Sequence, residues 1–184
     1  MPFSLTIDHE LELRLFEERH AAPLFSLTDR NREHLRVWLP WVDHTRSAGD
    51  TRAFIWQSLQ QFAGNNGLNA GIWYQGELVG AIGLRFLDWN AKRTEIGYWL
   101  SQDMEGRGIM TRAVSALLDY IFGDLGLNRV EIRAATGNRR SRAVPERLGF
   151  THEGTIRQEE RLTDSYTDSA VYGILAEEWA CRSR

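Results

Sequence analysis

Residues 105–111 read Glu-Gly-Arg-Gly-Ile-Met-Thr, and this stretch decides how the rest of the chain is interpreted. An alternating run at residues 93–101 precedes it, and the most regular apolar pattern of the chain, at residues 106–125, begins with it. Apolar residues recur there every three or four positions, which predicts an amphipathic helix. The two glycines allow a tight turn and a close approach to a ligand. The stretch therefore predicts a strand-to-helix turn whose free N–H groups and helix dipole attract phosphate.

The same stretch excludes two familiar nucleotide-binding motifs. It lacks the Lys and the Ser or Thr that end the phosphate loop of nucleotide hydrolases. It also lacks the third glycine of the dinucleotide-binding fingerprint. Residues 105–142 nevertheless carry seven Arg and four acidic residues, a local charge of +3, with Arg107 and Arg112 beside the turn. A plain strand-to-helix turn without a ligand stays open as the alternative.

Upstream of the turn, the chain reads as a strand, two helices and a hairpin. Residues 5–16 alternate apolar and charged side chains and are predicted as one half-buried strand. Helices are predicted at residues 20–37 and 47–65, on either side of an aromatic loop at residues 38–46. A hairpin is predicted from residues 70–74 and 78–86, because a tight Gln-Gly-Glu turn separates two strand-like runs.

Downstream of the turn, strands and helices alternate to the end of the chain. The patterns predict a strand at residues 130–134, a helix at residues 139–148, and an antiparallel pair at residues 150–161 and 166–175. This pair turns at residues 163–165. The order of elements predicts a mixed α/β sheet, and a length of 184 residues suits a single domain.

Composition narrows the class of protein further. Lys92 is the only lysine among 22 basic residues, and 25 acidic residues give a net charge of −3, which argues against a general nucleic-acid binder. One cysteine, Cys181, and five scattered histidines provide no disulfide and no ligand pair at helical spacing, so we expect no metal. The sequence has no run of 18 apolar residues and no signal peptide. We therefore expect a cytoplasmic protein that does not contact the membrane.

Several tracts in a fixed order carry a resemblance to a known family. They are EIGYWL at residues 95–100, GRGIMT at 106–111, SRAVPERLGF at 141–150, and LPWV at 39–42. Over nearly its whole length the chain resembles the GNAT superfamily of acetyl-CoA-dependent N-acetyltransferases, and it is most similar to the RimJ/RimL-type branch. That branch acetylates the N-termini of ribosomal proteins and their relatives, and dimers are common in it.

The resemblance implies a fold and a reaction. The fold is the single-domain GNAT acyl-CoA N-acyltransferase fold: a mixed, mostly antiparallel sheet with a splayed parallel pair and helices on both faces. Within one domain at residues 1–184, residues 1–66 are expected on the acceptor side, 67–150 form the acetyl-CoA-binding core, and 151–184 form a C-terminal hairpin. The reaction is transfer of acetyl from acetyl-CoA to a primary amine, with a protein N-terminus as acceptor.

The resemblance also assigns the cofactor site. The pyrophosphate of CoA is expected on backbone N–H groups of residues 107–111, and the pantetheine arm is expected in the splay between residues 93–101 and 129–135, paired with backbone like an added strand. The Arg side chains at 139–142 are candidates for the CoA phosphates, with a solvated basic helix face as the alternative. The predicted cofactor-binding residues are Trp99, Leu100, Arg107, Gly108, Ile109, Met110, Thr111, Asn138, Arg139 and Arg142.

Two residues depart from the family pattern. Glu105 stands where the family has Gln or Arg, and because it brings negative charge near the phosphates we expect its side chain to point away. Pro145 occupies the position at which many GNAT enzymes carry the Tyr that protonates the leaving thiolate. In the RimJ/RimL-type branch, a Ser at the position of Ser141 is proposed for this role. A helix N-cap is the alternative role for Ser141.

The attacking amine must lose a proton, and a carboxylate suits this step. Glu160 matches the acid that is proposed as the base in RimL-type relatives, whereas Glu95 lies on the strand expected to line the cleft. An ion pair with a neighbouring Arg is the alternative for both. Backbone near Trp99 is expected to polarise the thioester oxygen.

The acceptor side is the least defined part of the site. We expect Trp38, Trp41, Asp43 and His44 to form an aromatic and acidic pocket for a cationic amine, unless the two Trp residues only anchor their loop. A small-molecule amine, such as an antibiotic or a polyamine, stays open as the acceptor. A CoA-binding module without catalysis stays open as well, because the usual Tyr is missing.

Overall fold

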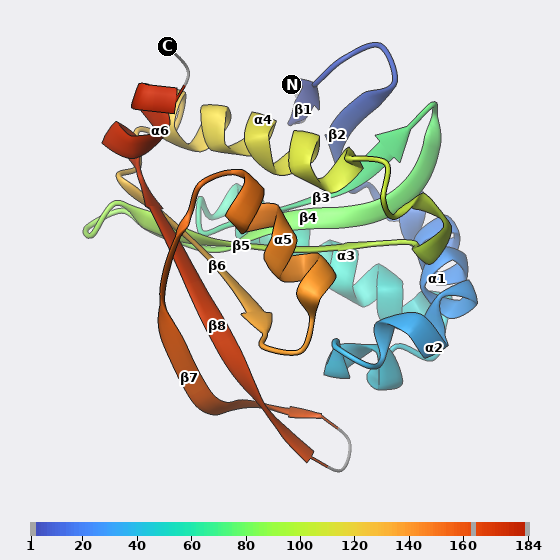
Figure 1. Ribbon diagram of the computed structural model, residues 1–184. Coiled ribbons are helices and arrows are strands. Elements are labelled where there is room, and N and C mark those ends of the chain that lie inside the picture. Colours follow the sequence, from blue (N-terminus) through green and yellow to red (C-terminus); the bar gives the residue numbers. More distant parts are fainter. Residues whose placement is uncertain (1–2, 163–164, 183–184) are drawn as a thin grey trace.

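The computed structural model describes residues 3–162 and 165–182, and within these residues eight strands form one sheet (Figure 1). The strand order across the sheet is β1-β2-β3-β4-β5-β6-β8-β7, and of these neighbours only β5 and β6 are parallel. The strands are β1 (Ser4–Thr6), β2 (Leu11–Leu15), β3 (Leu68–Tyr74), β4 (Glu77–Asp88), β5 (Arg93–Leu100), β6 (Arg129–Ala135), β7 (Thr151–Leu162) and β8 (Ser165–Leu175).

Helices cover both faces of this sheet (Figure 1). The amphipathic helix α4 packs on one face, where its Leu117, Leu118 and Ile121 are fully buried against strand residues. Each such side chain stabilises the fold by about 1.5–3 kcal/mol. Residues of α1 and α3 pack on the other face around Phe16 and Trp73. The helices are η1 (Glu18–His20), α1 (Ala21–Arg30), α2 (Arg32–Leu35), η2 (Pro40–His44), α3 (Ala48–Ala63), η3 (Gln102–Met104), α4 (Ile109–Gly123), α5 (Arg139–Arg147) and α6 (Ala176–Arg182).

The parallel strands β5 and β6 pair over only part of their length. Their register runs from Arg93 opposite Arg129 to Ile96 opposite Ile132, and then the strands diverge (Figure 1). Beyond this point β5 stays paired with β4, and β6 stays paired with β8. Because each strand is held by its outer neighbour, the sheet opens between them. The predicted fold class, including the splayed parallel pair, is confirmed.

Two predicted elements are each divided in two. The strand predicted at residues 5–16 is the hairpin β1–β2, because the Asp8 carboxylate accepts the N–H groups of Glu10 and Leu11 and reverses the chain. The helix predicted at residues 20–37 breaks at Asn31 into α1 and α2. The Arg32 side chain, which follows the break, donates to the carbonyls of Val42 and Thr45 and so holds the η2 segment.

The elements that follow the glycine turn also differ from the predictions at some of their boundaries. Helix α4 begins at Ile109, three residues later than predicted, because both glycines of the turn have a left-handed backbone. Residues 176–182 form helix α6, which the prediction of a C-terminal hairpin alone omitted. The Trp179 indole N–H donates to Asp119 and docks α6 on α4. Of the turn predicted at residues 163–165, positions 163 and 164 lie outside the described residues.

Candidate functional site

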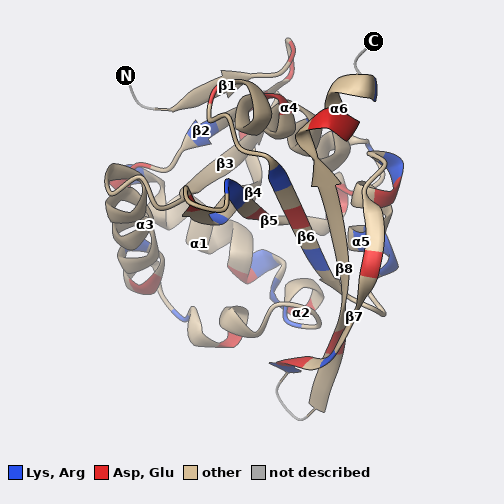
Figure 2. Ribbon diagram, turned by 90° about the vertical axis from the view of Figure 1, so that its left-hand side faces the viewer, with Lys and Arg blue, Asp and Glu red and all other residues tan. Residues whose placement is uncertain are grey.

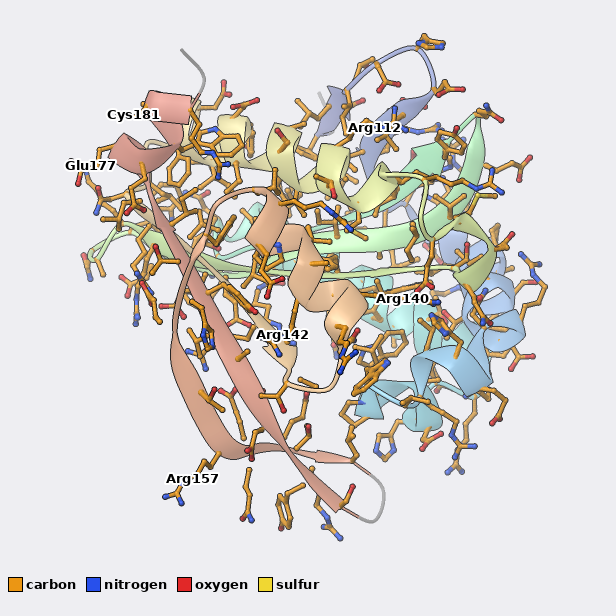
Figure 3. The ribbon with its side chains drawn as sticks, in the orientation of Figure 1. Arg112, Arg140, Arg142, Arg157, Glu177 and Cys181 are labelled. Carbon is orange, nitrogen blue, oxygen red and sulfur yellow. The ribbon has the colours of Figure 1, made fainter. Side chains whose placement is uncertain are left out.

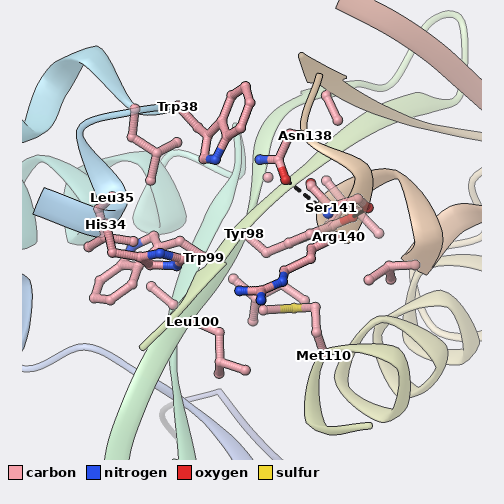
Figure 4. Close-up of a pocket in the computed structure, with 18 of the residues that line it drawn as sticks. His34, Leu35, Trp38, Tyr98, Trp99, Leu100, Met110, Asn138, Arg140 and Ser141 are labelled. Atoms are coloured by element: carbon pink, nitrogen blue, oxygen red, sulfur yellow. Dashed lines mark hydrogen bonds between the residues drawn. The ribbon is translucent and has the colours of Figure 1, made fainter. Parts of the chain in front are cut away.

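A cleft of about 1570 Å³ opens where β5 and β6 separate (Figure 4). One side is formed by the end of β5, the turn at residues 105–112 and the start of α5. The other side is formed by residues of α1, α2, η2 and α3. The cleft therefore joins the segment with the glycine turn to the aromatic segment near the N-terminus.

Nine of the ten residues predicted to bind the cofactor line this cleft. Arg142 is not among the lining residues, because its guanidinium donates to the Tyr172 hydroxyl at 2.8 Å and to the Thr136 carbonyl at 2.9 Å. The neighbouring Arg139 is exposed and has no hydrogen bond or ion pair from its side chain to any described residue. The nine lining residues are Trp99, Leu100, Arg107, Gly108, Ile109, Met110, Thr111, Asn138 and Arg139.

The glycine turn presents free donors to the cleft. Gly106 and Gly108 have φ angles of 76° and 73°, a conformation that L side chains avoid. Gly108 is the N-cap of α4 and offers no side chain to bond the first turn. The N–H groups of residues 109–111 thus have no partner within the helix and lie at the positive end of its dipole. This arrangement suits an anion such as phosphate.

Glu105 does not point away from the cleft, and that expectation was wrong. Its carboxylate accepts a hydrogen bond from His34 Nε2 at 3.0 Å and another from the Arg140 guanidinium. The Arg140 guanidinium balances the negative charge of Glu105 beside the turn, and both donors hold its carboxylate in place. The resulting contact joins α2, the glycine turn and α5 across the cleft, and Figure 3 shows Arg140 reaching in that direction from α5.

The start of α5 is organised by Asn138 rather than by Ser141. The Asn138 side chain accepts the Ser141 N–H at 3.1 Å, so Asn138 is the N-cap (Figure 4). The N-cap alternative for Ser141 is therefore wrong, and Ser141 lines the cleft in the first turn of the helix. Sequence reasoning missed Tyr98, whose hydroxyl donates to the Ser141 carbonyl at 2.8 Å. Burial raises the pKa of Tyr98, which keeps this donor protonated.

The two candidate bases have different surroundings. Glu160 lines the cleft, and its side chain forms no ion pair or hydrogen bond with any described residue. Glu95 is 6% exposed and does not line the cleft. Its carboxylate pairs with Arg85 at 3.3 Å and with Arg133 at 3.5 Å, which is the ion-pair alternative. Burial raises the pKa of Glu95, and these two Arg oppose the rise.

On the acceptor side, three of the four predicted residues line the cleft. They are Trp38, Trp41 and His44, and the Trp41 ring lies 6.1 Å from that of Trp99. Asp43 is not a lining residue and pairs with Arg36 at 3.2 Å. The predicted acceptor pocket is thus aromatic, but the predicted acid, Asp43, does not line it.

The described residues provide neither a metal-binding cluster nor a membrane-spanning helix. Within residues 3–162 and 165–182, no three His, Cys, Asp or Glu side chains are grouped so that they could hold a metal ion. No helix in this part of the chain has the length and apolar character needed to cross a membrane.

Comparison with known proteins identifies the family. The acetyltransferase (GNAT) domain matches residues 10–151. This chain belongs to the GNAT family of acetyltransferases. The GNAT chain is 39% identical to YdaF of Bacillus subtilis (strain 168), a proposed ribosomal N-acetyltransferase, over 96% of this chain and 97% of YdaF. It is 31% identical to the ribosomal-protein-serine acetyltransferase of Escherichia coli (strain K12), over 94% and 96% of the two chains.

A solved structure supports the same family and fold. The GNAT chain superposes with a TM-score of 0.91 on RimL, a ribosomal L7/L12 α-N-protein acetyltransferase in complex with coenzyme A. The two are 28% identical, and the match covers 94% of this chain and 98% of RimL. The resemblance to the RimJ/RimL-type branch is confirmed, and the chain is an N-acetyltransferase of the GNAT family.

Proposed function

We propose that this enzyme transfers acetyl from acetyl-CoA to the N-terminal α-amine of a ribosomal protein. The observation that carries the proposal is the convergence, in one cleft, of the α4 N-terminus, the open edge of β5 and the Glu160 carboxylate, which has no partner among the described residues. The relatives named for ribosomal proteins support this acceptor. The whole chain acts as one catalytic domain in this proposal, and the acceptor would place it in the cytoplasm.

The cofactor is held by backbone and by a small set of Arg. The CoA pyrophosphate binds the N–H groups of residues 109–111, with Arg107, Arg139 and Arg140 as charged contacts. The pantetheine amides pair with β5 at Trp99 and Leu100, where this edge has lost β6 as a partner. We leave Arg142 out of the phosphate set because it does not line the cleft, whereas Arg139 and Arg140 do; Tyr172 and Thr136 bind its guanidinium.

The reaction then needs a base for the amine and an acid for the thiolate. Glu160, directly or through a water, takes a proton from the amine, and the nitrogen lone pair attacks the thioester carbon. The β5 backbone near Trp99 stabilises the negative charge on the thioester oxygen. The C–S bond breaks as the C=O bond reforms, and the departing thiolate takes a proton from the Ser141 hydroxyl. As the amide forms, the nitrogen gives its second proton to the Ser141 oxygen, and Glu160 releases the first proton to solvent. The products are the acetylated amine and CoA.

The roles of Glu160 and Ser141 are tested by Glu160→Gln and Ser141→Ala. Each change should lower kcat about 100-fold, the usual contribution of a general acid or base, while CoA affinity stays unchanged. Thiol release measures kcat, and isothermal titration measures the affinity. Glu177→Gln, on the exposed helix α6, is the matched control. Unchanged kcat in both variants would remove these roles, and failure to bind acetyl-CoA would remove the function itself.

The acceptor is tested with a panel of amines. Peptides that begin with Ser or Ala should be acetylated with a higher kcat/KM than polyamines or aminoglycosides. The aromatic lining by Trp38 and Trp41 suits a peptide backbone as well as a cationic amine. A preference for the small amines would contradict the ribosomal-protein acceptor while leaving the acetyl transfer intact.

A further inference from the structure

Arg133, near the end of β6, contacts carboxylates from three strands. Its guanidinium lies 3.2 Å from Glu131 on its own strand and 3.5 Å from Glu95 on β5, and it donates to Glu159 on β7. Arg133 itself is one third exposed and lines the cleft. Figure 2 shows that basic and acidic bands alternate along β6. One cation thus links the splayed strands to the C-terminal hairpin.

Two of these three carboxylates have a second Arg. Glu131 is also bound by Arg129 at 2.9 Å, and Glu95 is also paired with Arg85 at 3.3 Å. Glu159 has no other ion pair or hydrogen bond from its side chain to the described residues. Loss of Arg133 would therefore leave Glu95 and Glu131 paired but would release Glu159. Among its three contacts, the one that Arg133 alone provides is therefore the contact with Glu159 on β7.

Strand β7 is irregular at this point. Its pairing with β8 shifts between Ile156 and Glu160. Over this interval β7 advances by four residues while β8 advances by two. Gln158, inside this bulge, has a φ of 52°, and its N–H donates to Asp168 at 2.8 Å. A bulge re-aims the side chains beside it and bends the strand. The residue at which regular pairing resumes is Glu160, the lining residue to which we assigned the base.

We propose that Arg133 is a positioning residue for acetyl transfer: it binds Glu159 and thereby holds the β7 bulge so that Glu160 faces the cleft. This inference rests on the proposed role of Glu160. Arg133 acts through β7 and carries no proton in the reaction. A planar guanidinium suits the task because it can bind carboxylates from several directions at once, which an ammonium group does less well.

The contact is tested from both ends, with Arg133→Gln and Glu159→Gln. Each variant should lower kcat about 10- to 100-fold, the scale expected when a reacting group is displaced by about 1 Å. The KM for acetyl-CoA should change less than about twofold, because the phosphate turn is untouched. Arg133→Lys should recover part of kcat. Thermal unfolding of each variant checks that the fold is intact.

Glu153→Gln is the matched control. It removes a similar contact from β7, the pair with Arg129, at a separate shift in register between His152 and Gly154, ahead of the bulge at residues 156–160. Its kcat should stay within twofold of the wild-type value. A loss of kcat equal to that of Glu159→Gln would show that any weakening of β7 has the same effect, and would overturn the proposal.

Combination with Glu160→Gln separates positioning from general weakening of the fold. If Arg133 acts through Glu160, Arg133→Gln should cause no further loss of kcat in the Glu160→Gln background. A full additional loss, or a large rise in KM for either substrate, would instead make Arg133 a binding residue. If Glu160→Gln slows the enzyme but Glu159→Gln does not, only the positioning role fails. If Glu160→Gln has no effect, the assigned base and the positioning role fail together.

Discussion

The Tyr98 hydroxyl spans the opening between β5 and α5 with a single hydrogen bond. Backbone pairing between β5 and β6 ends at Ile96, so the bond from Tyr98 to the Ser141 carbonyl lies beyond it, two residues along β5. The residue is half-buried, and its raised pKa keeps the hydroxyl a donor throughout the neutral range. This bond sets the distance between Ser141 and the strand on which the pantetheine arm is proposed to lie.

Replacing Tyr98 by Phe removes this bond with little change in volume. The Ser141 carbonyl would lose its partner, so the free energy of unfolding should fall by about 1 kcal/mol. We expect kcat/KM for acetyl-CoA to fall several-fold, because Ser141 is then less well placed. Urea denaturation and initial rates measure the two effects. Tyr120→Phe, on α4 outside the cleft, should leave the rate unchanged, and an equal loss in both variants would contradict a specific role for Tyr98.

At the scale of elements, the N-terminus of α4 depends on the backbone of one glycine. Gly108 is the N-cap, its φ is 73°, and a Cβ at this position would touch nothing within 4 Å. The requirement for glycine therefore comes from the backbone conformation and not from crowding. The same helix ends near Gly123, where a Cβ also meets nothing and the backbone does not have a positive φ.

These two glycines give predictions of opposite sign. Gly108→Ala should lower the free energy of unfolding by about 1–2 kcal/mol, because an L side chain disfavours the left-handed backbone. It should also weaken CoA binding, which isothermal titration would detect. Gly123→Ala should raise the free energy of unfolding by up to about 1 kcal/mol, because Ala is the better helix former. A stabilising Gly108→Ala, measured by urea denaturation, would show that the turn does not need this backbone.

At the scale of the whole molecule, ion pairs join four strands on the face of the sheet that carries Glu95. They run from Arg85 on β4 through the β5–β6 pair to Glu153 and Glu159 on β7. The carboxyl groups in this network differ in pKa. Burial raises the pKa of Glu95, whereas hydrogen bonds from Arg129 hold the pKa of Glu153 below its ordinary value of 4.5.

The shift at Glu153 predicts how stability changes with pH. Because its pKa is lowered by folding, Glu153 contributes stability that is present above pH 4.5 and is lost as pH falls through the lowered value. Glu153→Gln should therefore be less stable than the wild type at pH 7, and the difference should shrink as the pH falls below 4.5. Urea denaturation between neutral and acid pH measures this, and a difference that stays constant with pH would contradict it.

Local sequence patterns predicted the order and type of most elements and the turn that begins α4. Alternation and helical periodicity act over a few residues, so the β3–β4 hairpin and helices α3, α4 and α5 could be predicted near their observed bounds. Breaks that side-chain contacts cause could not be predicted in this way. An example is the chain reversal at Asp8 that divides the first predicted strand. The terminal helix α6 was missed as well, and part of what holds it is a contact with Asp119 on α4, far away in sequence.

For the site, the sequence by itself determined which residue types are present, and most of the residues that it predicted line the cleft. The partners and orientations of the charged side chains were decided by the tertiary structure. Glu105, Glu95 and Arg142 each bind partners from other elements, and so their distance in sequence gives no sign of the contact. The physical reason is that a buried or half-buried charge must be paired or hydrogen-bonded. Its partners come together only when the sheet and its helices have assembled.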